Sequence, residues 1–252
     1  MFKVIIKDTN EEVSRAAFNV MKEVLDSKPN PVLGLATGSS PVGLYKEMIK
    51  DHEETGRSYK DIITFNLDEY VGIPRDHEQS YYTFMHENLF NYIDCPEENI
   101  HVPEGNTDDH EKACVDYENA LKQHVVDIQV LGIGNNGHIG FNEPSDVFSK
   151  GTGLVNLTDS TIDANKRFFA SRDEVPTQAL SMGVGQIMNA DSILLLAMGK
   201  GKAEILEKSL FGDVTPQVPA SILQFFKGNV YVCADEEALS VIMERHPEAV
   251  TK

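Results

Sequence analysis

Residues able to bind a phosphate occur together just before a helical pattern. Thr37, Gly38, Ser39 and Ser40 stand between a hydrophobic run and Pro41, which opens that pattern. Hydroxyls and free backbone N–H groups at the start of a helix are suited to bind an anion. A Walker A loop is excluded, because no Gly-Lys-Ser/Thr follows at the required spacing. The alternative is an ordinary strand-to-helix turn with Ser40 as its N-cap.

Two adjacent acids, Asp68 and Glu69, end a second apolar stretch, in the segment FNLDEYVG at residues 65–72. A carboxylate at the rim of a cleft can act as a general base. It can equally cap a helix or join a salt bridge, and the sequence alone leaves this choice open.

Glycines dominate a third stretch, which reads LGIGNNGHIGFNEP at residues 131–144. Its G-x-G-x-x-G pattern suggests a dinucleotide site, but that site needs a helix directly after the loop, and Pro144 follows without any amphipathic stretch. We therefore reject a dinucleotide site. The glycines let the backbone pass close to a ligand, and His138 and Glu143 project from the loop. This setting favours a functional histidine over a structural one.

The elements that must position these residues alternate between continuous apolar runs and longer amphipathic ones. Continuous runs are typical of parallel strands buried on both faces, and the amphipathic runs have helical spacing. The order predicts an α/β fold with three layers: a mainly parallel open sheet with helices on both faces. In such folds ligands bind beyond the carboxyl ends of the strands. The predicted strands are 3–7, 32–36, 62–67, 128–132, 193–198 and 229–234, and the predicted helices are 10–28, 41–54, 80–93, 108–126, 200–211 and 236–246.

Residues 144–181 are the least regular part of the sequence. They contain a short apolar patch at 154–157 and a short helical stretch at 163–169. An insertion of this kind is often a lid over the site, and a plain surface excursion is the alternative. No repeat, linker or charge block marks a boundary. We expect one domain over residues 1–252, with a candidate lid at about 145–181.

The composition excludes several classes of protein. With 41% hydrophobic and 25% charged residues, the chain is not disordered. The longest aliphatic run, residues 193–198, is far shorter than the ~20 residues of a bilayer span. A net charge of −18 argues against nucleic-acid and membrane-surface partners, though not against a small phosphorylated substrate. Without a signal-peptide pattern, we expect a cytoplasmic protein. Scattered cysteines and histidines predict no metal site.

Several motifs, in order and at matching spacing, resemble those of the glucosamine-6-phosphate deaminases, in the glucosamine/galactosamine-6-phosphate isomerase family. The resemblance covers nearly the whole chain, and its most specific parts are the blocks that contain Asp68 and His138. The matching segments are ATGSSP at 36–41, NLDEYVG at 66–72, SYYTFMH at 80–86, GHIGFNEP at 137–144, ANKRFF at 164–169, GVG at 183–185 and GKGKA at 199–203.

This resemblance implies an enzyme that converts glucosamine 6-phosphate and water to fructose 6-phosphate and ammonia, without a metal or organic cofactor. It implies that His138, oriented by Glu143, opens the pyranose ring, and that Asp68 moves a proton from C2 to C1. The 6-phosphate would be held by the hydroxyl-rich turn at residues 37–40 together with Arg167 and Lys202.

One position departs from the pattern of many family members, which carry Asp two residues before the histidine. Here that residue is Asn136. An amide can orient His138 by hydrogen bonding, but it cannot stabilise an imidazolium as a carboxylate does. Glu143 would then carry that charge role alone.

Two other functions are alternatives. A 6-phosphogluconolactonase-type hydrolase shares the fold and a Gly-His loop, but it needs no base at C2, so the NLDEY and FNEP blocks favour the deaminase. A sugar-phosphate sensor would need a DNA-binding segment, for which this acidic chain has no room.

The sequence also bears on the oligomeric state of the protein and on the regulation of its activity. The sequence leaves the oligomeric state open, with a homo-oligomer as one alternative. Some family members are hexamers activated by N-acetylglucosamine 6-phosphate through paired basic residues. Gly153 and Val155 stand at those positions, so we expect hyperbolic kinetics without such activation.

Overall fold

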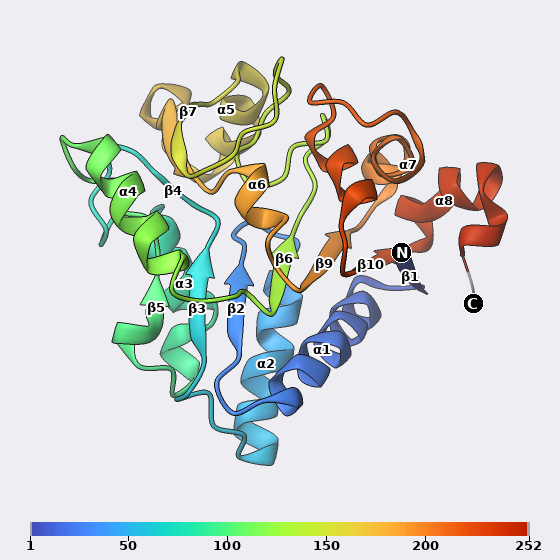
Figure 1. Ribbon diagram of the computed structural model, residues 1–252, viewed down its shortest axis with the longest axis horizontal. Coiled ribbons are helices and arrows are strands. Elements are labelled where there is room, and N and C mark those ends of the chain that lie inside the picture. The colour runs from blue at the N-terminus through green and yellow to red at the C-terminus, as the bar shows by residue number, and fades with distance from the viewer. Residues whose placement is uncertain (1, 251–252) are drawn as a thin grey trace.

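A seven-stranded parallel sheet forms the centre of the computed structural model, which describes residues 2–250 (Figure 1). The prediction of a mainly parallel α/β sheet with helices around it is confirmed, and each of the six predicted strands is present. In spatial order the strands are β1 (Phe2–Lys7), β10 (Asn229–Asp235), β9 (Ser192–Ala197), β6 (Ile128–Leu131), β2 (Val32–Leu35), β3 (Ile63–Asn66) and β5 (Ile100–His101).

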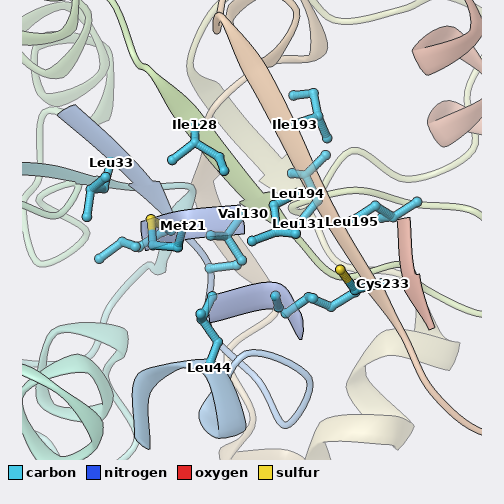
Figure 2. Packing of buried hydrophobic residues seen from close by; sticks show 14 of the residues in the cluster. Met21, Leu33, Leu44, Ile128, Val130, Leu131, Ile193, Leu194, Leu195 and Cys233 are labelled. Atoms are coloured by element: carbon cyan, nitrogen blue, oxygen red, sulfur yellow. The ribbon is translucent and has the colours of Figure 1, made fainter. Parts of the chain in front are cut away.

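Helices α1 and α2 bury an apolar side in the core of this sheet. Figure 2 shows Met21 and Leu44, from the first two helices, among side chains of β2, β6 and β9, all of them members of one buried cluster. Helix α1 begins with a capping box, in which Thr9 and Glu12 satisfy the free N–H groups of its first turn. The helices are α1 (Asn10–Ser27), α2 (Val42–Thr55), α3 (Tyr81–Asn88), α4 (His110–Leu121), α5 (Asp159–Asn165), α6 (Val184–Ile187), α7 (Ala203–Phe211) and α8 (Glu236–Arg245).

A second, antiparallel sheet was not predicted from the sequence. It joins β4 (Asp68–Tyr70), β8 (Gln178–Ser181) and β7 (Gly153–Asn156). Its strands are only three or four residues long, too short to give a clear alternation. The predicted apolar patch at 154–157 is largely β7, so residues 145–181 hold short regular elements. These elements pack with Tyr70 of β4 and Phe141 in a small apolar cluster separate from the main one: Tyr70, Phe141, Leu157, Ile162, Val175 and Ala179.

Several predicted helix ends were wrong. The helix predicted over 80–93 ends at Asn88, because Leu89 leaves the helical conformation with φ −148°. The helix predicted over 108–126 ends at Leu121. The stretch predicted at 163–169 begins earlier, as α5, because Thr158 supplies its N-cap. Helix α2 starts at Val42 with Pro41 as N-cap, so Ser40 is not the cap.

None of the helices in the part of the chain that the structure describes has the length and hydrophobicity of a bilayer-spanning segment.

The turn between β2 and α2 is fixed by one buried hydroxyl. Tyr45 Oη accepts a hydrogen bond from the Ala36 N–H (3.1 Å) and donates one to the Ala36 carbonyl (2.5 Å). Tyr45 itself is fully buried. It therefore satisfies both backbone groups of the residue that leads into the segment 37–40.

We expect Tyr45→Phe to lower the free energy of unfolding by about 1–3 kcal/mol, because it leaves two buried backbone groups unpaired. Urea unfolding followed by circular dichroism measures the change. Tyr231→Phe is the matched control, since among the described residues the Tyr231 hydroxyl has a hydrogen bond only with the exposed Lys3. Equal losses in the two variants would contradict this role for Tyr45.

Candidate active site

A cavity of about 470 Å³ opens beyond the carboxyl ends of β2, β3 and β6. This is where ligands bind in open α/β sheets. The structure brings nine of the ten predicted site residues to its wall, and Glu143 stands behind that wall against His138. The nine are Thr37, Gly38, Ser39, Ser40, Asp68, Asn136, His138, Arg167 and Lys202.

The hydroxyl-rich turn, residues 37–40, connects β2 to α2. Gly38 has φ +92°, a conformation that favours glycine. The chain turns here, and Ser39 and Ser40 line the cavity directly before α2 begins at Val42. Such an arrangement suits an anion.

Asp68 lies where the chain passes from the parallel sheet into the antiparallel one. Strand β3 ends at Asn66 and β4 begins at Asp68, whose side chain is only 5% exposed. Burial, followed by the negative charge of Glu69, raises the pKa of Asp68 to about 8. Its carboxyl is therefore a stronger base than an ordinary aspartate once it loses its proton.

The two adjacent acids have different surroundings. Glu69 accepts hydrogen bonds from the backbone N–H groups of Tyr70 (2.8 Å), Tyr81 (2.8 Å) and Tyr82 (2.9 Å). It thus caps the start of α3, whereas Asp68 faces the cavity. Burial raises the pKa of Glu69, and these three hydrogen bonds oppose that effect. Of the roles left open by the sequence, capping belongs to Glu69.

The glycine-rich loop passes close to both chemical groups. A Cβ on Gly134 would lie 2.3 Å from the His138 ring, so only glycine leaves room for the imidazole there. Gly140 has φ +57°, and a Cβ on it would lie 3.5 Å from Asp68 Oδ2. The loop therefore brings His138 and Asp68 into one cavity although they are far apart in sequence.

His138, Asn136 and Glu143 form a connected group. Asn136 Nδ2 donates to Glu143 Oε2 (2.6 Å), and the His138 backbone N–H donates to Asn136 Oδ1 (3.2 Å). His138 Nδ1 lies 3.4 Å from Glu143 Oε2. That is an ion-pair distance without hydrogen-bond geometry, and among the described residues Nδ1 has no hydrogen-bond partner. The carboxylate is positioned to stabilise a charged imidazole.

Two threonines that sequence reasoning missed hold the other oxygen of Glu143. Thr158 Oγ1 donates to Glu143 Oε1 (3.2 Å), and Thr161 Oγ1 donates to the same oxygen. Burial acts to raise the pKa of Glu143, but contact with His138 and hydrogen bonds from Thr161 and Asn136 outweigh it and lower the pKa to about 2. The only sequence signal was the T-x-x-T spacing, which is equally typical of an N-cap.

The two predicted phosphate ligands differ in how they are held. Lys202 Nζ donates to the carbonyl of Ile133 and to Asn135 Oδ1, both at 2.7 Å. These bonds fix the ammonium group at the loop, and burial lowers the pKa of Lys202. Arg167 is exposed, and its guanidinium stacks over the Phe168 ring at 4.6 Å. It has no ion-pair partner within residues 2–250.

Tyr81 is a further cavity residue that was quoted only as part of a motif. Its ring stacks on Phe141 (5.9 Å, 15°) and packs against Tyr70 (4.7 Å). It begins α3 directly after the N-cap Ser80, so the Glu69 cap also fixes its place at the cavity.

No group of three or more His, Cys, Asp or Glu side chains within residues 2–250 could hold a metal ion.

The chain is similar to several proteins of one kind. Residues 7–232 match the family described as glucosamine-6-phosphate isomerases/6-phosphogluconolactonase. A glucosamine-6-phosphate deaminase from Thermoanaerobacter sp. (strain X514) is 48% identical over 95% of each chain. Another from Lachnoclostridium phytofermentans is 49% identical over 93% of this chain and 100% of its own length.

Solved structures point the same way. A monomeric glucosamine-6-phosphate deaminase superposes with a TM-score of 0.91 and 42% identity, over 95% of this chain and 99% of that one. The 6-phosphogluconolactonase from Trypanosoma brucei has a TM-score of 0.76 over 95% of this chain and 98% of its own, but only 18% identity. The second likeness shows a shared fold alone.

We expect Asp68→Asn to stabilise the protein increasingly as the pH rises from about 5 to 8. In this window the folded state holds a proton on Asp68 that the unfolded state, with an aspartate pKa of about 3.9, has released. Wild-type stability therefore falls with pH through this group, with a slope on the order of 1 kcal/mol per pH unit, and asparagine removes that fall.

Urea unfolding of both proteins at several pH values measures this difference. Asp213→Asn is the control, because its carboxyl is exposed. A gap between wild type and Asp68→Asn that stays constant over pH 5–8 would show that Asp68 is not titrating near 8.

Proposed function

The chain belongs to the family of glucosamine-6-phosphate isomerases and 6-phosphogluconolactonases, and we propose that it converts glucosamine 6-phosphate and water to fructose 6-phosphate and ammonia. It is an enzyme that acts on an amino-sugar phosphate. The observation that carries the assignment is the buried Asp68 carboxyl in the same cavity as His138 and Glu143. A lactonase needs no base at C2 of its substrate, and the lactonases of similar fold are only distant relatives of this chain.

Ring opening is the first step of the proposed mechanism. His138 would move a proton between the anomeric hydroxyl and the ring oxygen, which breaks the bond between C1 and that oxygen and leaves an open-chain aldehyde. Its partner Glu143, with a pKa of about 2, stays ionised and stabilises the imidazolium that forms in between. Asn136 orients this carboxylate through its amide.

Proton transfer between carbons is the second step. Ionised Asp68 would take the C2 proton of the open chain while the aldehyde oxygen gains a proton from the substrate's ammonium group, which gives an enolamine, and Asp68 would then return its proton at C1. The resulting imine at C2 adds water, and ammonia leaves to give the ketose. Because burial raises the pKa of Asp68 to about 8, it is matched to accept a proton from carbon near neutral pH.

The 6-phosphate would lie between the hydroxyl-rich turn and the two cations. Thr37, Gly38, Ser39 and Ser40 offer hydroxyl and N–H donors, and Lys202 and Arg167 offer positive charge in a chain of net charge −18. In this proposal no metal or organic cofactor takes part. We also infer that the enzyme is cytoplasmic. We infer no nucleic-acid partner, since the negative charge of the chain would repel a phosphate backbone.

A lid role for residues 145–181 is supported by the cavity wall. Six residues of α5 and the turn after it line the cavity: Ser160, Thr161, Ala164, Asn165, Arg167 and Phe168. A substrate whose phosphate binds Arg167 would hold this segment over the sugar.

Ammonia release from glucosamine 6-phosphate by the purified protein tests the activity, and Asp68→Asn tests the base. We expect Asp68→Asn to lower kcat by about 10²–10⁴-fold, because the proton transfer at C2 loses its acceptor. Deuterium from solvent should appear at C1 of the product with the wild type and disappear with the variant. Near-wild-type turnover of Asp68→Asn would assign the base elsewhere, and no ammonia from the wild type would overturn the activity.

Lys202→Ala and Arg167→Ala should each raise KM by roughly 10- to 100-fold, with a smaller effect on kcat. A charge-assisted hydrogen bond to the remote phosphate is worth about 1.5–3 kcal/mol and is made equally in the ground and transition states. Steady-state kinetics measure the split. Lys200→Ala is the control, because Lys200 is exposed and lies outside the cavity wall. Unchanged KM in both variants would move the phosphate site.

A further inference from the structure

The first turn of α5 and its N-cap are hydrogen-bonded to the Glu143 carboxylate, which contacts His138. Thr158 is the N-cap of this helix, yet its bond from the Thr161 N–H is long, at 3.4 Å. Thr161 Oγ1 also donates to Glu143 Oε1, and the single proton of Thr158 Oγ1 is shared between that oxygen (3.2 Å) and Thr161 Oγ1 (3.1 Å). A capping role alone therefore does not account for the orientation of the two hydroxyls.

Glu143 is held on both of its oxygens by different parts of the chain. Oε1 receives the two hydroxyls of α5, and Oε2 receives the Asn136 amide and faces His138 Nδ1. The Glu143 side chain is 9% exposed, so little water competes for these positions. Rotation of the carboxylate away from His138 would break the hydrogen bonds from the threonines.

The charges around this group make the threonines matter. Asn136 is neutral. Among the described residues, Glu143 is the one carboxylate within ion-pair distance of the His138 ring. Hydroxyl donors to Oε1 stabilise the ionised form of Glu143 but leave its charge in place. A cation at the same position would neutralise that charge. The ionised Glu143 carboxylate therefore keeps its negative charge, with Oε2 at 3.4 Å from His138 Nδ1.

We propose that Thr158 and Thr161 are positioning residues for ring opening, which hold Glu143 ionised and turned toward His138. This inference rests on the proposed function, because ring opening is the step that uses the pair. The threonines act only through Glu143. Removing a threonine hydroxyl should therefore lower activity only when residue 143 carries a carboxylate.

A double-mutant cycle tests this dependence. We expect Thr161→Val to lower kcat/KM for glucosamine 6-phosphate by about 10-fold, the scale of one hydrogen bond to a charged group, and Thr158→Val to lower it less, because its bond is longer. In a Glu143→Gln background, the same Thr161→Val change should cost less than about 2-fold, since coupled residues are not additive. Thr161→Ser, which keeps the hydroxyl, should restore activity to within about 2-fold of the wild type.

Two controls separate positioning from damage to the fold. Thr152→Val makes the same substitution in the same segment, but it removes a hydroxyl that bonds Gln186 away from the cavity, so activity should be retained. Competitive inhibition by inorganic phosphate should have the same Ki in Thr161→Val as in the wild type, because the phosphate ligands are untouched.

Equal losses from Thr161→Val in the wild-type and Glu143→Gln backgrounds would overturn the proposal, as would a rise in the phosphate Ki that matches the loss of activity. These outcomes presuppose ammonia release by the wild type. If the wild type releases none, the proposed function fails and this inference fails with it. An active wild type with additive losses refutes only the positioning role.

Discussion

The burial of the Asp68 carboxyl is the constraint on which the rest of the site depends. The chain leaves the parallel sheet at Asn66 and enters the antiparallel sheet at Asp68, so the carboxyl is held where the two sheets meet. Its neighbour Glu69 accepts hydrogen bonds from two backbone N–H groups at the start of α3, those of Tyr81 and Tyr82, and from the N–H of Tyr70 in β4. No cation within residues 2–250 offsets the burial of Asp68, and its pKa rises as a result.

Two carboxyl groups thereby receive opposite properties from their surroundings. Glu143 has donors on both oxygens and a pKa of about 2, whereas Asp68 has a pKa of about 8. One is suited to remain a fixed negative charge beside His138, and the other to take up and release a proton. Environments that drive the pKa values of two acids apart assign them different roles in one reaction. With Asn136 in place of a second carboxylate, this division rests on Glu143 and its hydrogen-bond donors.

Much of the fold and site could be predicted from local patterns, and the failures have physical reasons. Continuous apolar runs revealed six of the seven central strands, and β5 was missed because it is only two residues long. The motifs after the strands revealed residues such as Asp68 and His138, because the carboxyl ends of parallel strands meet at one edge. The antiparallel sheet was missed because its strands are too short to show a period. The bond from Thr161 to Glu143 was missed because it joins distant segments, and a threonine near a helix start has an ordinary local explanation.

The most direct test of Asp68 as the base is the pH dependence of kcat/KM in the wild type and in Glu69→Gln. Glutamine keeps a carbonyl oxygen for the start of α3 but removes the negative charge that helps to raise the pKa of Asp68. In the wild type, kcat/KM should rise with pH and level off above about 8. In Glu69→Gln the same rise should occur at lower pH, while titration of the substrate is common to both enzymes. A rise at the same pH in both proteins would contradict the account.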